Sequence, residues 1–168
     1  KVCDAHWEGE QYIQEDGEPA RGIVEIEGKS YLFREEDGAV QKNAENFAYG
    51  DYEYSTDEAG VIVGVRVPEG VTSVPGKQFF GLKQLQTADV GSHVTYLGAD
   101  FVDAACGVVI YTSQGSLAAV YAKMRNIPVR YSDGDVPLEG ISLSETQLLL
   151  RPQEAASLQV SYEPWDAT

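Results

Sequence analysis

The apolar residues in the middle of the chain recur with a period of 23 residues. Between residues 62 and 131, a shift of this size, such as from Val67 to Val90, superposes apolar positions. The matched pairs are Val67 with Val90, Val71 with Val94, Val74 with Leu97, Phe79 with Val102, Leu82 with Ala105, Leu85 with Val108, and Ile62 with Leu85 one cycle earlier. One cycle is too short to bury its own apolar face. We therefore expect the cycles to stack and every matched residue to lie in one shared core.

The same pattern predicts where the strands of these cycles lie. Short strands are expected near residues 62–67, 85–90, 108–112 and 127–131, parallel to one another along one edge of the stack. A fixed period of about 20–29 residues is typical of a leucine-rich solenoid, in which each coil supplies one short strand. Fewer than three full coils is marginal for such a fold. The segment before residue 61 is therefore expected to cap the first coil by packing on it.

A helix is predicted at residues 116–126, between the last two strands. The hydroxyl of Ser116 can accept a hydrogen bond from a free backbone N–H at the start of a helix. Asn126 can end the helix, and Pro128 cannot continue it. An apolar face with helical spacing is formed by Leu117, Val120, Tyr121 and Met124. We expect this face to close the end of the core.

Four stretches of this region carry a resemblance to a known family. They are residues 70–74, 78–85 and 93–98, and the ending 109–129. These stretches resemble the BspA-type leucine-rich repeats of bacterial surface proteins. The resemblance implies a leucine-rich-repeat solenoid over residues 61–131 and a non-catalytic binding module for adhesion or protein recognition at the cell surface.

The first 60 residues contain three units of a different kind. Residues 11–17, 31–38 and 52–60 each start with an aromatic strand and end at a glycine, the first two through an Asp-Gly turn and the third through Ala-Gly. Asp-Gly between alternating apolar residues predicts a β-hairpin, because the turn needs positive φ. A further turn at Glu27 and Gly28 joins residues 22–26 to 30–33. This third of the chain is therefore expected to be β-hairpin repeats.

These units resemble the cell-wall-binding repeats (choline-binding type) of Gram-positive surface proteins, most closely at residues 27–40. In that family, aromatic cages hold a quaternary ammonium by cation–π attraction. The resemblance implies ligand-binding aromatic faces at Trp7, Tyr12, Tyr31, Phe33, Tyr52 and Tyr54. The family's Gly-Trp pair is Gly22-Ile23 here. The other interpretation is that Tyr12, Tyr31, Phe33, Tyr52 and Tyr54 form hairpin core and cross-strand pairs.

The end of the chain predicts a third segment at residues 132–168. Residues 132–135 read as a linker, and residues 140–144, 148–154 and 164–168 resemble the opening of a bacterial Ig-like domain, group 2. About three strands are expected there, whereas an Ig-like sandwich has about seven. An unpaired edge of this kind can form a dimer or pair with the solenoid. The expected fold is thus mostly β with one short helix, a capped solenoid followed by a partial Ig-like segment.

Charge and composition exclude some functions. The net charge of −15 disfavours binding to nucleic acid and to anionic membrane surfaces, and no run of residues is apolar enough for membrane insertion. Cys3 and Cys106 are expected to be free thiols. The chain begins at Lys1, and we expect it to be part of a longer protein.

The residue types of a reactive centre do not gather in this sequence. His6 and His93 are the two histidines, and neither belongs to a Cys-His or Ser-His-Asp pattern. The acidic turns lack the dense Asp-x-Asp-x-Asp-Gly spacing of a calcium loop. We therefore predict no catalytic residue, no metal site and no cofactor.

The three resemblances imply an extracellular location, on the cell surface or wall of a Gram-positive-type bacterium. The expected partner is a host or matrix protein. Two alternatives remain: the chain anchors a larger protein to a cell-wall polymer, or it accompanies an enzyme whose catalytic domain lies outside these 168 residues.

Overall fold

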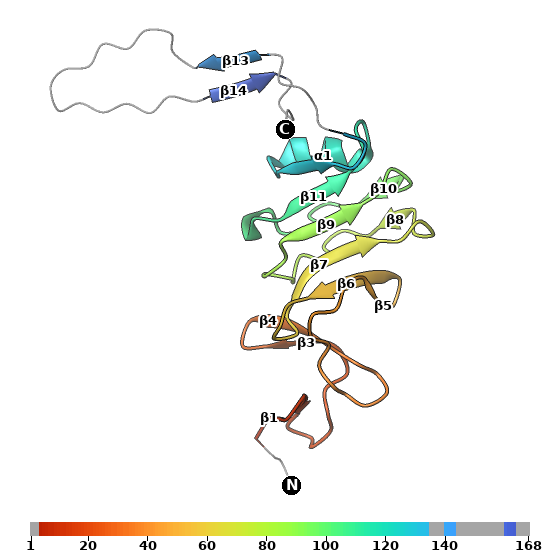
Figure 1. The fold of residues 1–168 in the computed structure, drawn as a ribbon, viewed down its shortest axis with the longest axis vertical. Helices are drawn as coiled ribbons and strands as arrows, with labels where there is room; N and C mark the ends of the chain where they lie inside the picture. The colour runs from red at the N-terminus through yellow and green to blue at the C-terminus, as the bar shows by residue number, and fades with distance from the viewer. Residues whose placement is uncertain (1–3, 135–139, 144–159, 164–168) are drawn as a thin grey trace, which may run out of the picture.

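Three antiparallel hairpins form the first part of the chain in the computed structural model, which describes residues 4–134, 140–143 and 160–163 (Figure 1). They are β1 (His6–Glu8) with β2 (Gln11–Ile13), β3 (Gly22–Ile26) with β4 (Lys29–Phe33), and β5 (Phe47–Tyr49) with β6 (Tyr52–Thr56). The predicted turn at Glu27 and Gly28 is confirmed, since both residues have positive φ between β3 and β4. The described chain is mostly β with one α-helix, as predicted.

Parallel strands follow the hairpins. The strands β7 (Ile62–Val67), β9 (Thr87–Val90), β11 (Val109–Thr112) and β12 (Val129–Tyr131) pair in parallel, which confirms the four predicted strands to within two residues. Two shorter strands, β8 (Ser73–Val74) and β10 (Tyr96–Leu97), form a second parallel pair. The larger sheet has the order β12-β11-β9-β7-β6-β5. It therefore joins the third hairpin to the parallel strands without a break.

The apolar period of the sequence is the register of these strands. Gly64 lies opposite Thr87 and Ser73 lies opposite Tyr96, each 23 residues further along, whereas Thr87 pairs with Val109 after 22. Consecutive cycles are also joined by hydrogen bonds, since both the backbone N–H and the hydroxyl of Thr95 donate to the carbonyl of Thr72. This explains why threonines match at these two positions.

The matched apolar residues form the main core, with one exception. Fully or almost fully buried are Ile62, Val67, Val74, Phe79, Leu82, Leu85, Val90, Val94, Val102 and Val108, and Val71 and Leu97 pack against them. The prediction is wrong for Ala105, which is exposed. A short 3₁₀ turn, η1 (Ala104–Cys106), turns Ala105 outward and brings Cys106 against the core. Asp103 starts this turn by accepting a hydrogen bond from the N–H of Ala105.

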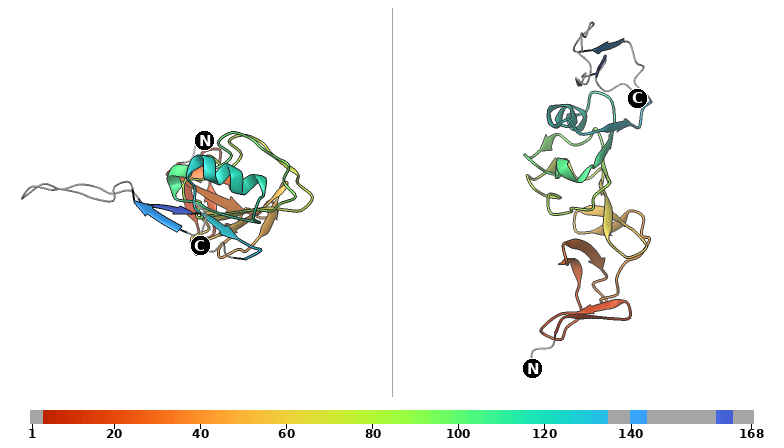
Figure 2. Two further views of the ribbon diagram at one scale, coloured as in Figure 1. Left: turned by 90° about the horizontal axis from the view of Figure 1, so that it is seen from above. Right: turned by 90° about the vertical axis from the view of Figure 1, so that its left-hand side faces the viewer.

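The helix α1 (Leu117–Arg125) has the predicted ends. The Ser116 hydroxyl accepts a hydrogen bond from the N–H of Ala119 at 3.1 Å, and Asn126 ends the helix with a φ of 55°. Seen from above, α1 lies across the end of the stacked strands (Figure 2). It packs against β10 and β11.

The predicted apolar face of α1 is wrong. Leu117, Val120 and Met124 are 39%, 50% and 80% exposed, whereas the alanines at 118, 119 and 122 are buried. Short side chains let the helix backbone approach β10 and β11 closely, and larger side chains on that face would hold it away. Of the predicted face, Tyr121 alone turns toward the core, with its ring 4.7 Å from that of Phe101.

The third hairpin covers the opposite end of the parallel strands, as the sequence predicts for a cap. The strand β6 pairs with β7 across the residue 60/61 boundary suggested by the sequence. The rings of Tyr52 and Tyr54 lie edge-on to Phe79, with centroids 4.9 and 6.3 Å apart. From the second hairpin, Leu32 enters the same core, and its N–H donates to the carbonyl of Gly60.

Beyond the helix, β13 (Gly140–Leu143) pairs with β14 (Val160–Glu163) in antiparallel orientation. Before this pair, residues 132–134 are tied back to the preceding strand and helix connection. The N–H of Ser132 donates to the carbonyl of Thr112, and Asp133 accepts from the N–H of Gln114. The remainder of the expected Ig-like segment, residues 135–139, 144–159 and 164–168, lies outside the described residues, as does the predicted dimer contact.

Close stacking of consecutive cycles predicts a sensitive position at Gly98. A Cβ atom there would overlap the backbone nitrogen of Gly76 in the preceding cycle. We expect Gly98→Ala to lower the free energy of unfolding by about 2 kcal/mol, because two backbones would have to move apart. Gly81→Ala is the matched control, since nothing lies within 4 Å of its added Cβ. Guanidinium denaturation measures both, and equal stabilities of the two variants would contradict this packing.

Candidate binding surfaces

The six aromatic residues singled out by the sequence separate into two groups. Trp7 lies near three rings, with centroid distances of 5.3 Å to Tyr12, 5.4 Å to Tyr31 and 5.8 Å to Phe33. Tyr52 and Tyr54 belong instead to the main core, where they meet Phe79. The structure therefore brings four of the six together.

Exposure narrows the set further. Trp7 is 42% exposed, and Tyr12 and Tyr31 are half-buried. Phe33, Tyr52 and Tyr54 are 0%, 8% and 4% exposed, so a ligand could not reach their faces without opening a core. The hairpin-core interpretation thus fits these three, and the surface aromatic group consists of Trp7, Tyr12 and Tyr31.

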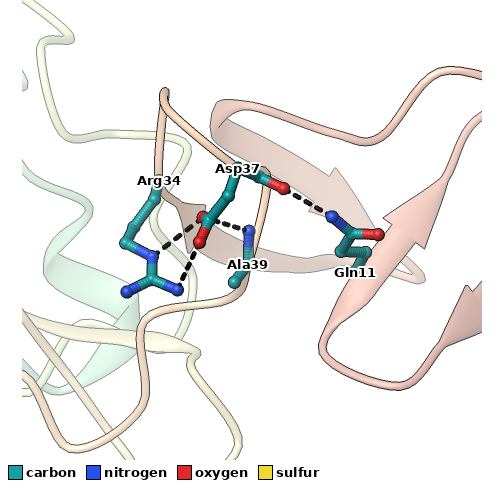
Figure 3. A network of polar contacts seen from close by, with 4 residues as sticks. All are labelled: Gln11, Arg34, Asp37 and Ala39. Carbon is teal, nitrogen blue, oxygen red and sulfur yellow. Dashed lines mark hydrogen bonds and ion pairs between the residues drawn. The ribbon is translucent and has the colours of Figure 1, made fainter.

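A polar network holds the hairpins that carry this group (Figure 3). The Asp37 carboxylate accepts two hydrogen bonds from the Arg34 guanidinium and one from the N–H of Ala39. The Ala39 hydrogen bond, together with Arg34, lowers the pKa of Asp37 below its ordinary value. Gln11 on β2 donates to the Asp37 carbonyl, which joins the first hairpin to the turn after β4. The network therefore fixes β2 beside Tyr31 and Phe33.

A shallow groove of about 300 Å³, which we call the Trp7 groove, opens beside the surface aromatic group. Trp7, Tyr31 and Val40 supply apolar walls, and Gly9 and Ala59 add small residues. Its charged lining residues are Lys42 and Glu58. The Lys42 ammonium forms an ion pair with Glu10 at 3.3 Å, whereas Glu58 has no ion pair among the described residues.

A second hollow of about 370 Å³ lies at Tyr12 and Val24. Its other lining residues are Ala5, Gln14, Glu15, Asp16 and Glu25, so three carboxylates border it. Asp16 accepts a hydrogen bond from the N–H of Glu18 within its own turn. This hollow is more polar than the Trp7 groove and offers one aromatic ring.

The outward face of the larger sheet forms another surface. One side chain per strand lines up across it through the strand register. We call this line the sheet-face row; it consists of Glu53, Arg66, Asp89, Tyr111 and Arg130. Its flanking positions on the same strands point inward and are buried on β7, β9 and β11. The row thus presents five adjacent side chains from five strands.

Ion pairs hold one half of this row, and the other half is free to contact a partner. Arg66 lies 3.4 Å from both the Glu53 and the Asp89 carboxylates. Tyr111 is 42% exposed, and Arg130 is exposed with no hydrogen bond or ion pair to another described residue. The row carries two acidic and two basic side chains, so it is electrically balanced in a chain of net charge −15.

The analysis of the sequence missed the sheet-face row, although the signal is present. Arg66, Asp89 and Tyr111 each stand between two residues that read as strand interior, at a spacing close to the apolar period. Extending the period from apolar to intervening positions would have found them. The groove residues Lys42 and Glu58 have no such signal, because they come from loops brought together by the hairpin packing.

The described residues offer little reactive chemistry. Within residues 4–134, 140–143 and 160–163, no group of three His, Cys, Asp or Glu side chains is placed to hold a metal ion. Cys106 is free and half-buried, and burial raises the pKa of its thiol, which donates to the Asp103 carbonyl. Cys3 lies outside the described residues. No helix in the described part of the chain is long and apolar enough to cross a membrane.

Comparison with known proteins gives no relative: no family model, no curated protein and no solved structure matches the chain. The surfaces described above therefore have to be interpreted from their own residues.

Burial of Tyr54 predicts a loss of stability at alkaline pH. Desolvation raises the pKa of Tyr54 to about 12 from 10.0. The stabilisation by the neutral phenol is fully present below pH 10 and is lost as pH rises toward 12, since the unfolded chain ionises first. Between pH 8 and pH 11, the free energy of unfolding of Tyr54→Phe should fall by about 1 kcal/mol less than that of the parent protein. Denaturant unfolding at both pH values measures this, and identical losses would place Tyr54 in water.

Proposed function

We propose that this chain is a non-catalytic protein-binding module of a bacterial cell surface, in which residues 61–131 form a leucine-rich-repeat solenoid of the BspA type. The observation that carries the proposal is the sheet-face row, an exposed and electrically balanced line of side chains on the parallel strands. The parallel register of 22 and 23 residues supports the solenoid assignment. Hairpin repeats capping one end and a partial Ig-like segment after residue 131 complete the proposed architecture.

The composition of the row suits a protein partner. Tyrosine and arginine are enriched at the residues that contribute most to protein–protein affinity, because they combine a large contact area with hydrogen-bond donors. Tyr111 and Arg130 are adjacent in the register, and both are exposed. Arg66 is already paired with two carboxylates, so its loss would affect the row mainly through the position of its neighbours.

The ground beside the row is low. The next line of side chains across the same strands consists of Ser55, Gly64, Thr87 and Val109. At Gly64 a Cβ would lie 2.9 Å from the Thr87 hydroxyl, so the absence of a side chain there keeps the strands close. Tyr111 and Arg130 therefore stand beside small residues, which lets a flat partner surface reach them. A host or matrix protein is the partner that this proposal expects, with the module outside the cell.

Anchoring to a cell-wall polymer is a second candidate function, and the Trp7 groove is the observation that favours it. Aromatic faces beside polar groups are used to bind sugars and quaternary ammonium groups, and Trp7 is the most exposed aromatic ring of the hairpins. In that case the chain would hold a larger surface protein, or a secreted enzyme with its catalytic domain elsewhere, at the wall.

Retention on two kinds of support separates the two functions. The protein is passed over immobilised collagen, fibronectin and fibrinogen, and over purified Gram-positive cell wall. We expect retention on at least one matrix protein, and about thirtyfold weaker affinity for the double variant Tyr111→Ala with Arg130→Ala. The matched control is Tyr96→Ala with Arg21→Ala, which removes the same residue types from exposed positions outside the row.

Each other outcome has a defined meaning. Equal losses in the two double variants would show that the sheet-face row is not the binding surface. Retention on cell wall alone, abolished by Trp7→Ala, would support the anchoring function and reject the first proposal. Absence of retention on every support would count against both.

A further inference from the structure

The negative charge of the chain is concentrated in the hairpins. Residues 1–60 contain 16 of the 27 acidic residues and five of the 12 basic ones, so 11 of the 15 net negative charges lie in about a third of the chain. Few of these carboxylates are neutralised, since the ion pairs with both partners in this segment join Arg34 to Asp37 and Lys42 to Glu10. A concentrated negative field of this kind attracts cations and repels anionic polymers.

The Trp7 groove lies inside this field and has a matching lining. The rings of Trp7 and Tyr31 are inclined at 67° with centroids 5.4 Å apart, and both line the groove. The ammonium of Lys42 is balanced by Glu10, so Glu58 leaves the groove with one uncompensated negative charge. Two electron-rich rings and a free carboxylate together favour a cationic group.

We propose that the Trp7 groove is a docking site for lysine or arginine side chains on an extended segment of a partner protein. The cationic head would lie against the Trp7 and Tyr31 rings and pair with the Glu58 carboxylate, and its aliphatic stem would cover Val40. Gly9 and Ala59 leave room for the backbone of the bound segment. An anionic wall polymer would meet the negative field of the hairpins, so charge complementarity favours the basic protein segment over the polymer.

This site is distinct from the sheet-face row. The row is formed by β6, β7, β9, β11 and β12, whereas the groove is formed by the first two hairpins and the loops near residues 42 and 58. Substitution of Tyr111 and Arg130 should therefore leave binding in the groove unchanged, and failure of one proposal does not entail failure of the other.

Fluorescence titration with a short basic peptide tests the inference. The full chain carries the background substitution Trp165→Phe, so that Trp7 is the one tryptophan and reports on the groove. The probes are a hexapeptide of alternating lysine and glycine, the same peptide with acetylated lysines, and an N-acetylglucosamine oligomer. We expect the lysine peptide to change the Trp7 emission with an affinity that falls as salt is added, and the acetylated peptide to bind at least about tenfold more weakly.

Charge-only variants decide whether the groove is responsible. Glu58→Gln should weaken binding of the lysine peptide by about fivefold, whereas Glu45→Gln, which removes the same charge from the same segment outside the groove, should change it by less than about twofold. Equal effects of the two variants would show diffuse attraction rather than a site. Equal binding of the acetylated peptide, or tighter binding of the sugar oligomer, would also overturn the proposal, and the latter would assign the groove to a wall polymer.

Discussion

Parallel backbone pairing between consecutive cycles is the constraint on which the rest of the structure depends. A shift of 22 or 23 residues takes each strand to its neighbour, and the same shift takes each buried side chain to the one it packs against. Backbone hydrogen bonds such as Gln86 N–H to the Val63 carbonyl and Val109 N–H to the Gln86 carbonyl repeat at this interval. Because the core is shared between cycles, no cycle is stable alone. The glycines at 76 and 98 show how little space separates adjacent backbones.

A stack of this kind exposes its core at both ends, and the two ends are closed in different ways. At one end, β6 extends the sheet in antiparallel orientation, and Tyr52 and Tyr54 cover Phe79. At the other, α1 lies over β10 and β11 with its alanines inward. Both closures use the residues closest in sequence to the stack. The two hairpins before β5 are then less constrained by the main core, and the Trp7 groove lies there.

Much of this fold could be predicted from the sequence, because burial repeats at a fixed interval. The strand positions, the Ser116 and Asn126 ends of the helix, and the turn at Glu27 and Gly28 follow from local rules and are confirmed. The inward face of α1 could not be predicted from hydrophobicity, since the space available against β10 and β11 selects alanine over leucine and methionine. Ala105 failed because a local Asp103 turn overrides the period.

The candidate surfaces were less accessible to prediction. A list of hairpin aromatics does not distinguish Trp7, exposed above a groove, from Tyr54, buried behind Phe79, because tertiary packing decides which ring faces water. The sheet-face row is encoded by polar residues between buried ones, a weak signal until the register is known. The groove depends on Lys42 and Glu58, which come together through packing of separate loops.

Amide hydrogen exchange measured by NMR tests the central claim most directly. If the third hairpin, the parallel strands and the helix share one core, the amides of Leu32, Gln86, Gly98, Val109 and Ile127, which all donate to other elements, should exchange with one common free energy of opening. That value should equal the free energy of global unfolding. Exchange of Leu32 and the β6 amides at a much lower free energy than those of β9 and β11 would contradict a single cooperative structure and divide the chain near residue 60.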